Sequence, residues 1–348
     1  MSRHLFSASA AARVEACPGS LYLQAVSRTS EDAERGNGGH KFLELVADGI
    51  PKHLALEAIA PEYRDECAAI DLDATFSGLV SLRPEVAYAI DVRDGSVRLL
   101  GSRLARAYVC GEYEVPGTVD LVATDVMSDV PVAVDWKTGF ADVPHPSVNL
   151  QVGFAAYCVA AESGAGEVEG RIAYHRGGGV PRVERHRFDS WELDGFLERL
   201  QRIHAAALEA RGRQTTLRPG EHCRYCPALA SCDAQTGLAR DMLPVLAETQ
   251  RRLTMLTPEQ AGEAWQKLRA IKQLADHVEE GLKAMARQQP LPLPNGQVLK
   301  ETRSHAVSFN KSTALALLRE RGVTDAEIAA LTTRVETRPV KAVSGKRK

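Results

Sequence analysis

The chain predicts a mixed α/β domain followed by a mainly helical extension. Up to about residue 211, segments with helical periodicity alternate with short apolar runs typical of strands, in the order helix, strands, helix, strands, helix. From residue 241 onward the pattern is helical, with an apolar stripe at Ala264, Leu268, Ile271, Leu274, Val278, Leu282 and Met285. We therefore expect one domain over residues 1–240 and an extension over residues 241–348.

The overall charge excludes a strongly basic nucleic-acid-binding protein. The 43 basic residues nearly balance the 45 acidic ones, so any contact with DNA must be local. A hydrophobic content of 44% is enough for a substantial core. The N-terminal segment lacks the apolar region of a signal peptide, and no run reaches the roughly 18 apolar residues of a membrane span. We therefore expect a cytoplasmic protein that does not enter a membrane.

The glycine-rich stretch Gly36 to His40 predicts a flexible loop that leads directly into a helix. Because the helix is expected to start where this loop ends, His40 should lie in its first turn. Gly49 and Pro51 should end the helix. A single histidine at such a position is most often a cap or a surface residue. Residues 51–81 then continue with helical periodicity.

The first predicted strand runs from Pro84 to Asp91, because apolar and polar residues alternate there. The runs Val97 to Leu100 and Ala105 to Val109 are expected to continue it as a meander around an Asp94-Gly95 turn. Glu85 begins the first strand. Two alternatives stay open for it: a carboxylate supplied to a site, or a side chain that faces solvent.

The most informative stretch runs from Gly117 to Gly139 and predicts a hairpin. Two apolar strands, Gly117 to Thr124 and Val130 to Trp136, flank a short polar turn, and each strand carries one carboxylate, Asp120 or Asp135. Side chains alternate between the faces of a strand, so Asp135 and Lys137 point to the same side. Two acids and a lysine could therefore converge at one strand end.

This combination suits a hydrated divalent cation. Carboxylate oxygens are hard ligands for Mg2+ or Mn2+, which activate water and neutralise charge on a phosphate. A lysine two residues after a ligating acid can orient that water or stabilise the transition state. The alternative is an edge hairpin in which an aspartate and a lysine form an ordinary surface pair, because Asp-x-Lys is a short motif.

A helix is predicted from Asn149 to about Ala161, with Gln151 in its first turn on the side nearest Lys137. A glutamine at such a position either contacts the site or is simply solvated. Strands at 172–174 and 183–188 follow, and Trp191 to Arg211 predicts a long amphipathic helix.

Three of the seven cysteines, Cys223, Cys226 and Cys232, form a C-x2-C-x5-C pattern. In a reducing compartment such spacing indicates metal or cluster ligation rather than disulfides, with structural zinc as the main competitor. The candidates for a fourth ligand are Cys17, His222, Cys67, Cys110 and Cys158. The last three lie in apolar contexts, where core packing is expected.

The extension begins with a capping box at Thr257, Pro258 and Gln260, which starts a long helix. An Asn295-Gly296 turn follows, then two short helices at 312–321 and 324–331. The basic tail from Thr333 either contacts phosphates or is a solvated chain end.

Together these motifs resemble the PD-(D/E)XK nuclease superfamily, in its RecB-like branch with an iron-sulfur cluster. The most similar members are the CRISPR-associated RecB-like exonucleases, the AddB-type cluster nucleases and related phage or prophage proteins. The resemblance spans roughly residues 10–235 and rests on the order of the motifs. They are Gly36-x3-His40, Gly117-x2-Asp120, Asp135-Trp136-Lys137, Gln151, and Cys17 paired with the distal Cys223, Cys226 and Cys232.

The resemblance implies a restriction-endonuclease-like core, in which helices flank a mixed central sheet. It implies that His40, Asp120 and Asp135 bind Mg2+ or Mn2+. It further implies that Lys137 assists the attacking water and that Gln151 positions the lysine or the DNA backbone. By the same resemblance a [4Fe-4S] cluster, with a structural role, is held by Cys17, Cys223, Cys226 and Cys232.

Three departures from the family pattern leave the metal ligands intact. Asn37 stands where threonine is common, and Trp136 separates the motif acid from the lysine. The tyrosine that usually follows the glutamine is displaced, because Ala155 holds its place and Tyr157 comes two residues later. Tyr157 is therefore, like Glu85, only an accessory candidate.

The resulting hypothesis is a metal-dependent DNA exonuclease that acts on single-stranded ends in phage or prophage recombination or DNA processing. Local basic and aromatic contacts to the strand are expected at Arg103, Arg106, Tyr174, His175 and Arg176. A non-catalytic DNA-binding or assembly module, working with a recombination or helicase partner, is the alternative. The intact Asp120, Asp135 and Lys137 argue against that alternative. A zinc-stapled protein of unrelated function is the third possibility.

Overall fold

The computed structural model describes residues 4–25, 31–104, 106–139, 142–176, 179–213, 217–229, 232–237, 257–293, 297–300, 317–324 and 327. The chain divides into two compact units, Met1–Glu301 and Thr302–Lys348. The boundary predicted at residue 240 lies within residues 238–256, outside the described residues, and stays a prediction. The basic tail and most of the two short helices predicted before it are outside them too.

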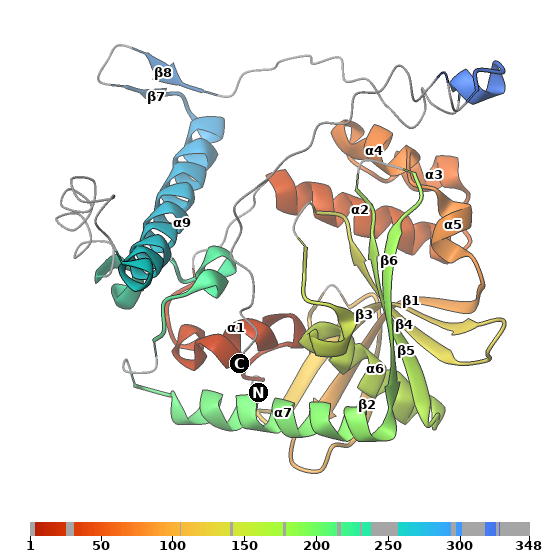
Figure 1. Cartoon of the computed structure of the whole chain (residues 1–348), viewed down its shortest axis with the longest axis horizontal. Coiled ribbons are helices and arrows are strands. Elements are labelled where there is room, and N and C mark those ends of the chain that lie inside the picture. The colour runs from red at the N-terminus through yellow and green to blue at the C-terminus, as the bar shows by residue number, and fades with distance from the viewer. Residues whose placement is uncertain are drawn as a thin grey trace. The chain divides into compact units, whose positions relative to one another are not determined.

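A six-stranded mixed sheet forms the centre of the first unit among the described residues (Figure 1). Its order is β2-β1-β3-β4-β5-β6; β4 and β5 are parallel, and all other neighbours are antiparallel. The helix α6 makes the crossover between the two parallel strands. The strands are β1 Leu79–Asp91, β2 Val97–Ser102, β3 Glu114–Asp125, β4 Pro131–Lys137, β5 Glu167–Tyr174 and β6 Arg182–Asp189, and a separate two-stranded pair is formed by β7 Leu291–Pro292 and β8 Val298–Leu299.

Helices cover both faces of the sheet, which confirms the predicted fold class (Figure 1). One core lies under α1, α6 and α7 and contains Tyr88, Phe154 and Ile172. The other lies under α2 to α5 and contains Phe42 and Trp136. The helices are η1 Ala8–Ala10, α1 Ala11–Ala16, η2 Pro18–Leu21, α2 Glu31–Ala47, α3 Lys52–Glu57, η3 Pro61–Tyr63, α4 Arg64–Ala68, α5 Leu72–Phe76, η4 Pro146–Val148, α6 Leu150–Ser163, α7 Ser190–Glu209, η6 Glu221–Tyr225 and α9 Pro258–Gln288.

Side-chain caps explain where the longest helices begin. The Asn149 side chain accepts hydrogen bonds from the first backbone N–H groups of α6, and Gly164 ends that helix in the left-handed conformation. Asp189 and Glu192 form a capping box at α7, and Thr257 and Gln260 form the predicted one at α9. None of the described helices has both the length and the apolar character that a bilayer crossing would need.

The glycine-rich stretch is not a loop, contrary to the prediction. Gly36 to His40 lies within α2, so His40 is in the middle of the helix rather than in its first turn. The reason is a close approach: Thr138 Oγ1 donates a hydrogen bond to the Gly36 carbonyl at 3.2 Å, and a Cβ on Gly39 would lie 2.5 Å from Thr138 Cγ2. Glycine here allows the helix to contact the end of β4.

The prediction of a third strand in the meander, from Ala105 to Val109, is also wrong. β2 ends at Ser102, and residues 106–109 form no strand. Arg103 and Arg106 have positive φ angles, 56° and 61°, in the left-handed region, which interrupts an extended backbone. The predicted hairpin is confirmed, because β3 and β4 pair antiparallel from Leu121 to Thr124.

Replacing Gly39 with alanine tests the close contact between α2 and Thr138. Gly39→Ala should lower the free energy of unfolding by roughly 1–3 kcal/mol, because the new methyl group overlaps Thr138. The matched control is Gly195→Ala in α7, where a Cβ meets nothing within 4 Å, and which should be neutral or stabilise by up to about 1 kcal/mol. Urea unfolding of both variants measures the difference. Equal stabilisation would contradict the proposed packing.

Candidate functional site

Two buried aspartates lie on the adjacent strands β3 and β4. Asp120 is 8% exposed and Asp135 is 5% exposed. The backbone N–H of Trp136 donates a hydrogen bond to Asp120 Oδ2 at 2.8 Å, which fixes the first carboxylate against the second strand. The Trp136 side chain is buried in the core beneath α2, so it anchors the strand end from the other face.

Lys137 joins Asp135 to the first turn of α6. Its Nζ lies 2.8 Å from Asp135 Oδ1 and donates a longer hydrogen bond, 3.4 Å, to Gln151 Oε1. The N-cap Asn149 accepts the Gln151 N–H at 2.9 Å, and this cap positions the glutamine. The arrangement predicted for Lys137 and Gln151 is therefore present.

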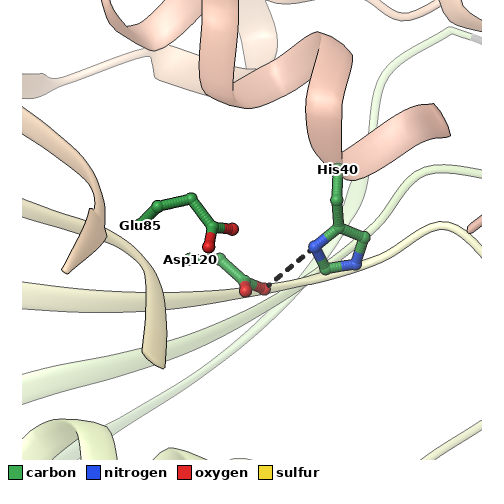
Figure 2. A group of neighbouring side chains, drawn as sticks. All are labelled: His40, Glu85 and Asp120. Carbon is green, nitrogen blue, oxygen red and sulfur yellow. Dashed lines mark ion pairs between the residues drawn. The ribbon is translucent and has the colours of Figure 1, made fainter. Parts of the chain in front are cut away.

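His40 and Glu85 complete a cluster around Asp120. Figure 2 shows their side chains pointing toward Asp120, and His40 Nδ1 lies 3.5 Å from Asp120 Oδ2. One ligand atom from each of the three residues lies within 4.8 Å of the others. Glu85 reaches the cluster from β1, where it has a φ of 52° and where the pairing with β3 is irregular between Val80 and Arg83.

The acids of this cluster differ in their protonation. Burial, together with the charge of Asp120, raises the pKa of Glu85 to about 7. Burial also raises the pKa of Asp135 to about 6, although Lys137 opposes the shift. Burial favours neutral Asp120 as well, but His40 and Lys137 outweigh it and lower the pKa of that carboxyl. His40 in turn has a raised pKa, because the attraction of Asp120 outweighs the effect of burial.

The donor set fits a hard divalent cation. It combines an imidazole nitrogen with carboxylate oxygens, which suit Mg2+ and Mn2+. Asp135 Oδ2 is buried, and in the part of the chain that the structure describes its one close partner is the Lys137 ammonium, whose Nζ lies 2.6 Å away. A buried carboxylate oxygen with spare acceptor capacity, next to repelling acids, is stabilised by a cation.

The family model of the PD-(D/E)XK nuclease superfamily matches residues 5–233, which is more than half of the chain. The chain belongs to the PD-(D/E)XK nuclease superfamily. A search of curated proteins found no match. A solved structure described as the crystal structure of SSO0001 is 13% identical, with 67% of this chain and 88% of that chain covered and a TM-score of 0.32. A TM-score this low adds nothing to the family assignment.

Asp120, Asp135 and Lys137, the residues predicted as the motif acids and lysine, lie together on β3 and β4, but Tyr157 does not join them. Its hydroxyl donates to the Gly95 carbonyl at 3.0 Å, and its ring packs near Phe196. Thr138 was not predicted to matter, yet its contacts with Gly36 and Gly39 set the position of the helix that carries His40. The Gly-x2-Gly spacing was the signal in the sequence.

A second group of side chains brings the two ends of the nuclease domain together. Cys17 ends α1, whereas Cys223, Cys226 and Cys232 follow α7, and all four are buried. Backbone N–H groups of Arg218 and Gly220 donate to the sulfur atoms of Cys17 and Cys223, each at 3.3 Å. Burial raises the pKa of Cys223; the hydrogen bond from Gly220 opposes this shift, and the other three cysteines add to it. Cys67, Cys110 and Cys158 are buried separately, as expected of core residues.

Glu85→Gln tests whether the third carboxylate contributes to cation binding. The substitution keeps the size of the side chain and removes its charge, so the affinity for Mn2+ should fall by about tenfold or more. Isothermal titration calorimetry with Mn2+ and no nucleic acid measures it. The control is Glu198→Gln, whose side chain is 71% exposed and pairs only with Arg202 among the described ion pairs. Unchanged affinity in the first variant would exclude Glu85 as a ligand.

Proposed function

We propose that the protein is a Mg2+- or Mn2+-dependent DNA exonuclease that hydrolyses phosphodiester bonds at single-stranded ends. One observation carries the proposal: in a member of this nuclease superfamily, Asp120, Asp135 and Lys137 meet on adjacent strands, with His40 and Glu85 beside them. Buried acids that lie close together, next to a lysine, are suited to phosphodiester hydrolysis and give no evident benefit to stability.

In the proposed mechanism His40, Asp120 and Asp135 would hold the cation, and Glu85, which lies beside Asp120, would add a further carboxylate. When bound, the cation would neutralise charge on the phosphate and lower the pKa of an attacking water. Lys137 orients the water and stabilises negative charge in the transition state. Its ammonium is held for this by Asp135 and Gln151, at 2.8 Å and 3.4 Å.

The finer assignments rest on the resemblance of the motifs to the RecB-like branch. They are exonuclease action, preference for single strands, a role in phage or prophage recombination or DNA processing with a recombination or helicase partner, and a cytoplasmic location. The four cysteines, one before the nuclease core and three after it, support that branch. The retained motif residues favour an enzyme over a non-catalytic DNA-binding module.

We also propose that Cys17, Cys223, Cys226 and Cys232 bind a [4Fe-4S] cluster. Four buried sulfur atoms, two of which accept backbone N–H groups, suit thiolate ligands. Tetrahedral zinc, at Zn–S distances of about 2.3 Å, would place the sulfur atoms about 3.8 Å apart. The split of one cysteine before the core and three after it, which resembles the RecB-like branch, favours the cluster over zinc. Because hydrolysis needs no electron, the proposed role of the cluster is structural. It would hold the segment that ends α1 against the segment that follows α7.

Metal-dependent cleavage is the direct test of the nuclease. We expect end-labelled single-stranded DNA to be degraded from its ends with Mn2+ and not with EDTA. Asp135→Asn and Lys137→Gln should each lower the rate by about 100-fold or more, because the groups that hold the cation or orient water are lost. Lys267→Ala in α9 is the control and should cleave normally. No cleavage by folded, cofactor-loaded protein would contradict the proposal and favour the DNA-binding module.

The cluster is tested by spectroscopy on anaerobically purified protein. The sample should be brown, with broad visible absorption and about four irons per chain. Cys226→Ala should lose the colour and lower the melting temperature, whereas the control Cys110→Ala, which changes a separate buried cysteine, should keep the colour. A colourless sample that contains zinc would contradict the cluster.

A further inference from the structure

A row of side chains crosses three strands at the catalytic end of the sheet. Lys137 on β4 is paired in register with Tyr174 on β5, and Tyr174 is paired with Arg182 on β6. Residues paired across neighbouring strands project from the same face of a sheet. All three side chains therefore lie on the face that carries Asp135. The pairing places Arg182 two strands, or about 10 Å, from Lys137.

Two arginines lie over the ring of Tyr174. The guanidinium carbons of Arg176 and Arg182 lie 4.6 Å and 4.1 Å from the ring centroid. Arg176 Nε also donates a hydrogen bond to the carbonyl of Gly139, two residues after Lys137, at 3.1 Å. Arg176 is thus attached to the segment that carries the lysine, and the Tyr174 ring connects Arg182 to Arg176.

Both guanidinium groups share one carboxylate oxygen. Asp142 Oδ1 lies 2.5 Å from Arg182 Nη2 and 3.1 Å from Arg176 Nη1. The Asp142 side chain is 68% exposed, and an exposed ion pair of this kind contributes only about 0–1 kcal/mol. A phosphate oxygen accepts the same pair of donors and carries at least as much charge. Asp142 can therefore be displaced at low cost.

We propose that Arg176 and Arg182 bind a second phosphate of the nucleic-acid strand that is cut at Lys137, and that Asp142 occupies this subsite in the free protein. The inference rests on the proposed function, because it takes the strand to run across the sheet from β4 to β6. The subsite contributes strand binding and direction; it takes no part in the bond that breaks. Arg182 and Asp142 were not predicted from the sequence to contact the strand.

The subsite is tested by binding without cleavage. Fluorescence anisotropy of a labelled single-stranded oligonucleotide in EDTA gives the affinity over a series of salt concentrations. Arg182→Gln should weaken binding roughly tenfold and reduce the salt dependence by about 0.7 of a counterion, the value for one phosphate contact to a single strand. Asp142→Asn should strengthen binding several-fold, which no folding defect can mimic. The control is Arg185→Gln, which removes a 57% exposed arginine from the opposite face of β6.

The outcomes separate this inference from the proposed function. If wild-type protein cleaves DNA with Mn2+ but Arg182→Gln and Asp142→Asn bind as the wild type does, the subsite is wrong and the nuclease stands. If Arg185→Gln weakens binding as much as Arg182→Gln, the effect is general charge and the subsite is again overturned. Wild-type protein that neither binds nor cleaves nucleic acid would overturn both.

Discussion

The burial of two carboxylates on neighbouring strands, in the middle of β3 and near the end of β4, is the constraint on which the site depends. Removing charged groups from water is costly, so each needs partners that the fold must supply. Asp120 accepts a hydrogen bond from the N–H of Trp136 and lies next to the ring of His40. Asp135 forms an ion pair with Lys137. Each partner comes from a different place: the strand itself, a helix on one face, and the strand end. The pairing of β3 with β4 and the position of α2 together supply these partners.

Close packing and backbone strain bring the remaining groups to these acids. α2 can carry His40 over the strand end because glycines at 36 and 39 leave room for Thr138. Glu85 takes a left-handed conformation within β1, which costs a non-glycine residue roughly 1–2 kcal/mol. Its carbonyl accepts the N–H of Arg103, itself at positive φ, so the strained residues support each other. Strain of this kind persists where the geometry serves a function.

Local signals predicted the parts of the fold that local chemistry determines. The β3–β4 hairpin, the helix α6 predicted from Asn149 and the capping box at Thr257 follow from residues close in sequence, and the structure confirms them. The glycine-rich stretch was mispredicted because its conformation depends on Thr138, about a hundred residues away. Whether Glu85 joins the site depends on an irregular strand pairing that no periodicity reveals. The row from Lys137 to Arg182 can be recognised only when the pairing register of three strands is known. Patterns in a single sequence do not reveal that register.

The proposed cluster at the four cysteines would stabilise the same site from a distance. Cys17 ends α1, which packs against α6 and α7 as well as η6, and Glu15 of α1 pairs with Arg199 of α7 through both carboxylate oxygens. The first turn of α6 presents Gln151 to Lys137. A ligand that ties α1 to the segment after α7 therefore restrains the helices that frame the lysine, although it lies outside the acidic cluster. This restraint depends only on the four sulfur atoms staying bound to the ligand, and it needs no electron transfer.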